Sequence, residues 1–485
     1  MWHAYVAKQN KQHTGHPMGY RIRQIEPDSQ FCDEVTVEVI TDHVPIETIE
    51  EVIEKCKVRE TRKRKLPAVL VVLLCIGMNL LCQMSLHYVL VKLVQGRRLL
   101  HAVGVDEVAV KSSISEARYR LGAKPLEMLF KRICRPLATP DTPGAFVFGL
   151  RLVALDGTTE TLPDTPENSR YFGRAKGDRG DSAFPQTQGV YLCECGTHAI
   201  FDAGFWPYAV SERVGGFRLL RSVEADMLMM WDRGFHDFDM FLGVIEREAQ
   251  VLSRLPAHVK PERVLNLPDG SWLAHITPST YQRRKTGERL LVRIIEYQLD
   301  DPNRPGHGEH HRLITTLLHP SLYPALDLVC LYHERWEVEI AIDEIDTHQR
   351  LVNHPLRSLK PVGVIQELYA LLLAHFVVRS VMHQAALAHD LDPDRLSFVN
   401  SVRLICDALI EFQLVDPLDH PRLWNRLLHD IAQFQLPERE NRSNPRVVKR
   451  KMSNFKLKRP EHWHPPQPTK SFREAVVLWT DPVPI

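Results

Sequence analysis

The sequence predicts a mixed α/β (α+β) core between two helical regions, and three observations lead to this prediction. Residues 45–136 carry apolar side chains at helical spacing. Residues 146–231 change to short apolar strands around one helical segment, and helical spacing returns from Leu331. Two of the strands end on an aspartate, Asp156 and Asp232. This element order is ribonuclease-H-like, a fold in which the two aspartate-bearing strands lie side by side.

The N-terminal region is predicted to be helical. Residues 36–145 are expected to form a DNA-binding domain, and residues 1–35 are expected to be disordered. Leu66–Cys82 is almost wholly apolar, but its length is at the lower limit for a membrane span, so we predict a buried core helix. A further helix is expected to leave Arg118 and Lys124 free to meet DNA.

The rest of the chain divides by pattern. The catalytic core is assigned to residues 146–248 and 331–385, and residues 249–330 to an inserted β-subdomain. The subdomain strands are predicted at Gln250–Leu255, Val264–Leu267, Trp272–Thr277, Arg289–Leu299 and Arg312–Leu318. C-terminal helices follow at residues 386–440. A basic tail at residues 441–485 is expected to be extended or partly disordered.

Composition limits the possible functions. The chain has 485 residues, 44% of them hydrophobic, and a net charge of only +1. Two dense basic clusters, residues 55–65 and 442–459, would attract phosphates in a salt-dependent way, although a solvated basic surface is an equal alternative. Nine scattered cysteines and a polar start without a signal peptide indicate the cytoplasm.

The most informative segment is a helix that begins near Tyr332. Tyr332, Arg335 and Glu339 stand at offsets zero, three and seven and therefore share one stripe of that helix. Glu339 would join Asp156 and Asp232. Three such carboxylates can hold two divalent ions, with Asp156 bridging them, and oxygen ligands favour Mg²⁺ with Mn²⁺ as a substitute.

These residues resemble a known family, the bacterial insertion-sequence transposases of the DDE type, specifically the IS-four family. The matching segments are Leu155–Thr158, Pro163–Asn168, Asp232–Phe235, Tyr332–Glu339 and Pro445–Arg450. The resemblance implies a DNA transposase that cuts double-stranded DNA at the terminal inverted repeats of its element and joins the ends to target DNA. It also implies two Mg²⁺ ions, a homodimer on DNA, no membrane and a nucleoid-associated cytoplasmic location.

The predicted catalytic and metal ligands are Asp156, Asp232 and Glu339. Tyr332 and Arg335 resemble the family's DNA-backbone contacts, although Arg335 and Glu339 could simply form a helical pair. The remaining predicted DNA contacts are Trp272, Arg118, Lys449, Arg450 and Lys451. Trp272 would stack on an extruded base, and core packing is the alternative for it.

One position departs from the family signature. A lysine is expected seven residues after Glu339, and this chain has Asp346 there. An anion would then replace a cation that contacts a DNA phosphate. The alternative function is therefore a catalytically weakened or inactive DNA-binding relic or repressor of the same family.

Overall fold

The computed structural model describes residues 38–62, 64–94, 111–177, 180–280, 283, 285, 287–350, 356–437, 448–449, 456–457 and 467–479. All of them belong to one compact unit, residues 35–485. The disorder expected for residues 1–35 lies outside the described residues.

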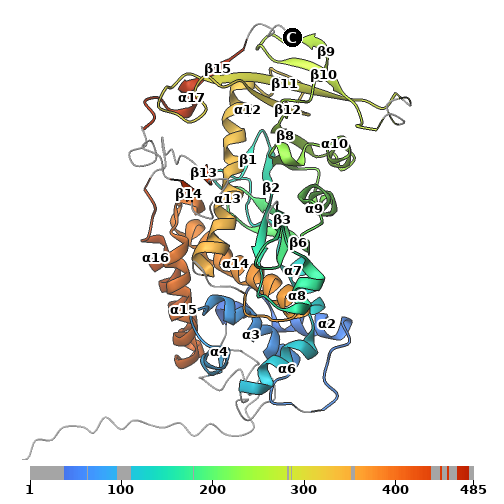
Figure 1. Ribbon diagram of the computed structural model, residues 1–485. Coiled ribbons are helices and arrows are strands. Elements are labelled where there is room, and N and C mark those ends of the chain that lie inside the picture. The colour runs from blue at the N-terminus through green and yellow to red at the C-terminus, as the bar shows by residue number, and fades with distance from the viewer. Residues whose placement is uncertain are drawn as a thin grey trace, which may run out of the picture. The chain divides into compact units, whose positions relative to one another are not determined.

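A mixed β-sheet carries the expected core topology (Figure 1). Its first part has the strand order β6-β5-β2-β7-β8. These strands are β2 (Leu150–Thr161), β5 (Gln186–Glu194), β6 (Ile200–Pro207), β7 (Met227–Trp231) and β8 (Gln250–Arg254). β2, β7 and β8 are parallel, and β5 and β6 are antiparallel to their neighbours. The predicted adjacency of the two aspartate strands is confirmed.

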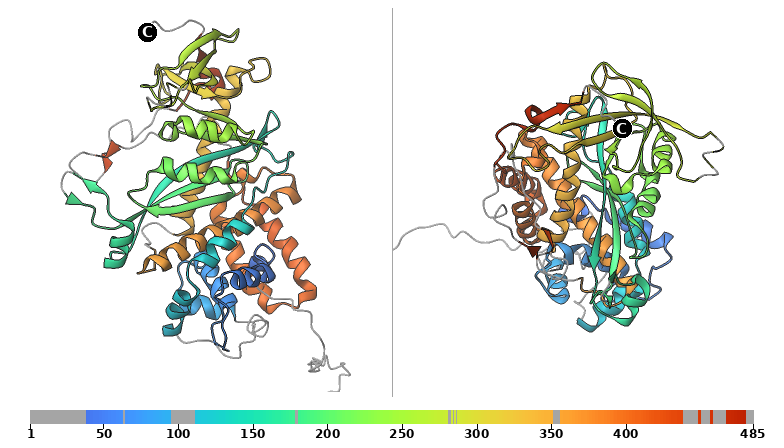
Figure 2. Two further views of the ribbon diagram at one scale, coloured as in Figure 1. Left: turned by 90° about the vertical axis from the view of Figure 1, so that its right-hand side faces the viewer. Right: turned by 45° about the horizontal axis from the view of Figure 1, so that its top comes forward.

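Alternation along β2 creates two separate apolar cores. Leu152 and Ala154 belong to one, and Val153 and Leu155 to the other. Neighbouring side chains on a strand point to opposite faces, so both faces of the sheet are covered by helices. Helices α9 (Glu212–Leu219) and α10 (Phe238–Ile245) cover one face, and α13 (Trp336–Asp343) and α14 (Pro361–His389) lie on the other (Figure 2).

The inserted strands form where the sequence predicts strands, but they do not make a separate sheet. They are β9 (Glu262–Asn266), β10 (Trp272–Ile276), β11 (Leu290–Leu299) and β12 (His311–Thr315). Because β12 pairs antiparallel with β8, the insertion extends the core sheet. The predicted domain division, with an inserted β-subdomain at residues 249–330, stays a prediction.

The C-terminal tail matches expectation only in part. Its described part forms α17 (Phe472–Ala475) and β15 (Val476–Leu478), and β15 pairs with β11 of the insertion. A short continuous apolar run at residues 475–479 is compatible with a strand. The tail is therefore extended at β15, as predicted, and helical at α17. Two short strands, β13 (Val448–Lys449) and β14 (Lys456–Leu457), pair with each other further upstream.

The remaining elements complete the helical regions and the short hairpins. The N-terminal helices are α1 (Glu38–Thr41), α2 (Ile46–Lys55), α3 (Ala68–Leu80), α4 (Leu86–Leu93), α6 (Lys111–Leu121) and α7 (Lys124–Ile133). The core adds β1 (Phe146–Val147), α8 (Pro166–Phe172), β3 (Lys176–Gly177), β4 (Gly180–Asp181), α12 (Ala325–Tyr332), α13 (Trp336–Asp343) and α14 (Pro361–His389). The C-terminal helices are α15 (Phe398–Leu414) and α16 (His420–Ala432).

The two most apolar helices lie in the protein core. Every residue of α3 is buried, which confirms the predicted core helix. Within the described ranges, α14 is the one helix long and apolar enough to cross a membrane, and 83% of its most apolar window is buried by protein. Because α3 and α14 pack against each other, each supplies an apolar partner for the other.

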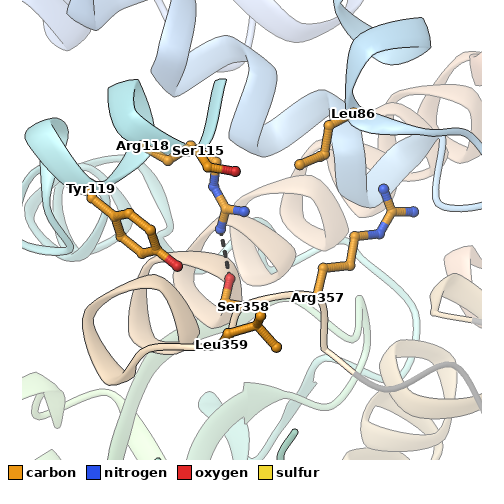
Figure 3. A pocket seen from close by; sticks show the side chains of 7 residues that line it. All are labelled: Leu86, Ser115, Arg118, Tyr119, Arg357, Ser358 and Leu359. Atoms are coloured by element: carbon orange, nitrogen blue, oxygen red, sulfur yellow. Dashed lines mark hydrogen bonds between the residues drawn. The ribbon is translucent and has the colours of Figure 1, made fainter. Parts of the chain in front are cut away.

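Arg118 holds the N-terminal helices against α14 and does not face solvent. Its Nε donates to Gln366 Oε1 at 2.9 Å and its Nη2 donates to Ser358 Oγ at 2.9 Å, beside a small pocket (Figure 3). Glu367 lies 3.9 Å from the same guanidinium. The expectation that Arg118 meets DNA is corrected, because a buried arginine needs fixed partners and Arg118 has them.

We predict that Arg118→Met lowers the free energy of unfolding by about 2–3 kcal/mol, because Ser358, Gln366 and Glu367 lose a charged hydrogen-bond partner. Chemical denaturation measures this. Lys124→Met is the matched control, since Lys124 is 64% exposed and pairs only at the surface; it should change stability by less than about 0.5 kcal/mol. Equal effects of the two variants would contradict a structural role for Arg118.

Candidate active site

The two aspartates come together through parallel pairing of β2 and β7. Leu155 stands opposite Trp231 in the register, so Asp156 and Asp232 occupy the next position on each strand. Asp156 does not end its strand, however, because β2 stays paired with β5 as far as Thr161. The strand-end prediction is right for Asp232 and wrong for Asp156.

Backbone hydrogen bonds orient both aspartates. The Gly157 amide donates to Asp156 Oδ1 at 2.8 Å, and the Gly234 amide donates to Asp232 Oδ1 at 2.7 Å. The second oxygen of Asp156, Oδ2, accepts a hydrogen bond from Arg335.

The segment that carries Glu339 is helical but not uniform. The α-helix α12 ends at Tyr332, one 3₁₀ turn spans His333–Arg335, and α13 begins at Trp336. The Tyr332 hydroxyl donates to the Trp231 carbonyl at 3.1 Å, at the residue before Asp232. This bond ties the helical segment to the end of β7. Burial raises the pKa of Tyr332 to about 12, so the phenol keeps its proton.

Arg335 connects two of the three predicted metal ligands. Its Nη1 donates to Asp156 Oδ2 at 3.3 Å and its Nη2 donates to Glu339 Oε1 at 2.7 Å. The guanidinium is largely buried, with 8% of its side chain exposed. Helical spacing alone predicted the pair with Glu339. The contact with Asp156 depends on the fold, and no local signal in the sequence marks it.

The surroundings of Asp156 disfavour its charged form. Burial raises its pKa to about 6, and the Gly157 amide and Arg335 counteract this, while Glu339 and Asp232 add to it. A partly buried, all-oxygen donor set around one cationic group fits a divalent cation such as Mg²⁺. Arg335 holds the place of positive charge between Asp156 and Glu339.

Trp272 does not lie on an exposed surface. It is 6% exposed, its indole nitrogen donates to Glu296 Oε2 at 2.9 Å, and Arg263 lies over its ring at 4.1 Å from the centroid. The prediction of base stacking by Trp272 is corrected in favour of core packing, because both faces and the polar edge of a buried indole need protein partners.

The predicted contacts in the tail are only partly within the described chain. Lys449 belongs to the short strand β13. Arg450 and Lys451 lie outside the described residues. Their contact with DNA stays a prediction.

Asp346 is partly buried and contacts other protein groups. It lies in a π-helical turn, Glu344–Gln349, which follows α13. Arg350 pairs with Glu160 and lies 3.5 Å from Asp346 Oδ1. Burial and the neighbouring Glu160 carboxylate raise the pKa of Asp346 to about 8. Burial and Glu160 therefore favour the protonated form of this side chain.

We predict that Asp346→Asn changes how stability depends on pH. The folded-state pKa of Asp346 is raised from 3.8 to about 8, so its contribution is fully present below pH 4 and is lost as pH rises to about 8. The variant lacks this loss, and its Tm should fall less than that of the wild type between pH 5 and about 8.5. Asp343→Asn, an exposed neighbour, is the control. A wild-type pH profile in Asp346→Asn would contradict the protonated state.

Two parts of the chain match known families. Residues 34–131 match the family described as Insertion element 4 transposase N-terminal, and residues 148–377 match the family described as Transposase DDE domain. The second match contains Asp156, Asp232 and Glu339.

Two known proteins are similar over most of the chain. Transposase InsG for insertion sequence element IS4, from Escherichia coli strain K12, is 28% identical over 416 residues, covering 84% of this chain and 91% of that protein. A solved structure, the synaptic complex of piggyBac transposase with hairpin DNA, aligns with a TM-score of 0.40 and 10% identity. It covers 83% of this chain and 86% of that chain.

Proposed function

The chain belongs to the insertion-sequence transposases with a DDE domain, related to insertion element 4, and from this premise we propose how it acts on DNA. Asp156, Asp232 and Glu339 bind divalent metal ions, and the protein cleaves DNA at the ends of its element and transfers those ends to target DNA. The observation that supports this best is Arg335, which bridges Asp156 and Glu339 beside Asp232.

Each residue has a separate task in this proposal. Asp156 would be a ligand of both ions, because its carboxylate stands between those of Asp232 and Glu339. Two bound Mg²⁺ ions would supply an activated water or 3′-hydroxyl and stabilise the leaving oxygen. Arg335 moves from the carboxylates to a DNA phosphate when metal enters, and its forked guanidinium suits that acceptor. Tyr332 keeps the helical segment aligned with β7.

The DNA partners are the terminal inverted repeats and the target duplex, and two copies of the chain hold the two ends together. The basic clusters at residues 55–65 and 442–459 supply phosphate contacts that weaken with salt. The tail residues Lys449, Arg450 and Lys451 belong to this contact set.

The alternative of an inactive DNA-binding relic depended on the charge of Asp346. Its raised pKa favours the protonated form, and Arg350 places a cation 3.5 Å from Asp346 Oδ1. Both effects reduce the negative charge that this position presents to DNA. We propose an active enzyme on this ground.

A cleavage assay separates the two functions. The protein is incubated with a labelled duplex that carries the terminal repeat of its element, in Mg²⁺, and products are resolved on a denaturing gel. Cleavage at the repeat boundary and joined products with a second duplex are expected. Binding without cleavage in the wild type, together with cleavage by Asp346→Lys, would support the relic instead.

A further inference from the structure

A second group of potential metal ligands lies on the other side of the helix that carries Glu339. It consists of His198, Glu337 and Asp394, whose ligand atoms all lie within 4.8 Å of one another. His198 follows the turn between β5 and β6, Glu337 is in the first turn of α13, and Asp394 lies in a 3₁₀ turn after α14. Three segments far apart in sequence therefore meet at one point.

One nitrogen of the His198 imidazole, Nε2, lies close to two carboxylates. His198 Nε2 lies 2.6 Å from Glu337 Oε2 and 3.2 Å from Asp394 Oδ1. One nitrogen carries at most one proton, and the hydrogen bond goes to Glu337. Asp394 Oδ1 is buried and has no hydrogen-bond donor among the described residues. Burial and Arg379 oppose the charged form of His198, but Asp394, Glu344 and Glu337 raise the pKa of His198 to about 9, so the imidazolium faces this oxygen without a hydrogen bond to it.

The surroundings of this oxygen favour a cation. Burial raises the pKa of Asp394 to about 8, and Glu337 and Asp392 act in the same direction, while His198 and Arg379 oppose them. Other atoms of the Asp394 side chain reach solvent, with 23% of the side chain exposed. An ion therefore has a path to the buried oxygen.

The far nitrogen of His198 is held as in many metal sites. His198 Nδ1 lies 3.3 Å from Glu344 Oε1. Without metal the Nε2 proton is shared with Glu337, and a bound metal ion would replace that proton while Glu344 keeps its contact with Nδ1. His375 and Arg379 in turn hold Glu344, and Arg379 Nη2 also contacts His198 Nδ1. All three residues are buried.

The spacing also suits a small divalent ion. Ligand atoms around a tetrahedral Zn²⁺ lie about 3.3 Å apart, given bonds of about 2.0–2.1 Å. The separation of 3.2 Å between His198 Nε2 and Asp394 Oδ1 is close to that distance. Glu337 Oε2 lies 2.6 Å from Nε2 and would have to move slightly away from it. An imidazole ligand favours Zn²⁺ or another first-row ion over Mg²⁺.

We propose that His198, Glu337 and Asp394 bind a structural divalent transition-metal ion, of the Zn²⁺ class, that is separate from the ions at Asp156, Asp232 and Glu339. The ion joins the β5–β6 turn and the turn after α14 to the first turn of α13. It positions the helix that carries Glu339 and takes no part in the DNA chemistry.

Cobalt binding tests the site without any cleavage assay. The full chain is treated with chelator, freed of it, and titrated with Co²⁺, whose visible absorption bands report a low-coordinate site. In the wild type the low-coordinate bands should saturate at one equivalent of Co²⁺, and Zn²⁺ should remove them, whereas Mg²⁺ should not. Asp394→Asn should weaken Co²⁺ binding at least tenfold and remove the Zn²⁺-induced rise in Tm.

Asp156→Asn is the matched control and should keep the full Co²⁺ spectrum, because it alters only the other group of carboxylates. Asp394→Asn replaces an oxygen that lacks a donor, so the variant is expected to fold, and His198→Gln provides a second test. Unchanged Co²⁺ binding in both variants, no binding by the wild type, or loss of binding in Asp156→Asn would overturn the proposal. None of these outcomes bears on DNA cleavage by the wild type.

Discussion

Glu339→Gln should abolish Mg²⁺-dependent cleavage of element ends, with a loss of at least about 10³-fold, which corresponds to about 4 kcal/mol of transition-state stabilisation. Glutamine keeps the size of the side chain and an oxygen that accepts from Arg335, but it removes the charge that a divalent ion needs. Single-turnover cleavage of a labelled repeat end measures the rate. Binding of the same duplex, measured by gel shift, should stay within about twofold.

Asp343→Asn is the matched control for this variant. Asp343 lies on the same helix α13, but its side chain is 60% exposed and pairs with His348 and Thr347 at the surface. Its cleavage rate should equal that of the wild type. Cleavage by Glu339→Gln at the wild-type rate would remove Glu339 from the metal site.

Arg335→Gln should lower the Tm of the metal-free protein and lower the cleavage rate by about 10²-fold. Without the guanidinium, Asp156 and Glu339 face each other with no cation between them, at a cost of about 2 kcal/mol for a partly exposed group. Mg²⁺ can replace the missing charge. The rise in Tm on adding Mg²⁺ should therefore be larger in Arg335→Gln than in the wild type, where Mg²⁺ must displace Arg335.

Arg403→Gln serves as the control for Arg335, because Arg403 is an exposed arginine on α15 that bonds to Asn400. Thermal unfolding with and without Mg²⁺ should not distinguish it from the wild type. If Mg²⁺ raises the Tm of Arg335→Gln by no more than that of the wild type, the guanidinium does not stand in for a metal ion.

The sequence predicts the core topology well because its signals are local and periodic. Apolar segments of strand length lead into Asp156 and into Asp232, and two further long strands and a helix lie between them in the order that places the aspartate strands side by side. The two-strand pairing then follows from topology rather than from any single motif. The strands of the insertion are also found where alternation predicts them, to within a few residues.

The failed predictions concern residues whose partners are distant in the chain. The local sequence around Arg118 is typical of an exposed helix, whereas its hydrogen-bond partner Gln366 lies 248 residues away. Trp272 lies on an inserted strand. Only the pairing of that strand with β11 shows that Glu296 accepts a hydrogen bond from the indole nitrogen of Trp272. In the same way, nothing near residues 476–478 indicates that this segment pairs with β11.

Asp346 shows how a sequence mismatch changes meaning in three dimensions. In the sequence alone, Asp346 replaces the cation of the family signature by an anion. In the fold it contacts Glu160 of β2 and Arg350, the residue after the π-helical turn, and burial raises its pKa. Its surroundings therefore disfavour the charge that raised the question of an inactive copy.

The most direct measurement of the central proposal is a change in metal preference. In Glu339→Cys a thiol replaces the carboxylate. Mg²⁺ binds a thiol poorly and Mn²⁺ binds it more readily, since transition ions bind softer ligands. If Glu339 is a metal ligand, Glu339→Cys should cleave the labelled repeat end in Mn²⁺ and not in Mg²⁺, whereas Asp343→Cys should cleave in both. Wild-type cleavage by Glu339→Cys in Mg²⁺ would contradict the proposal that Asp156, Asp232 and Glu339 form the metal site.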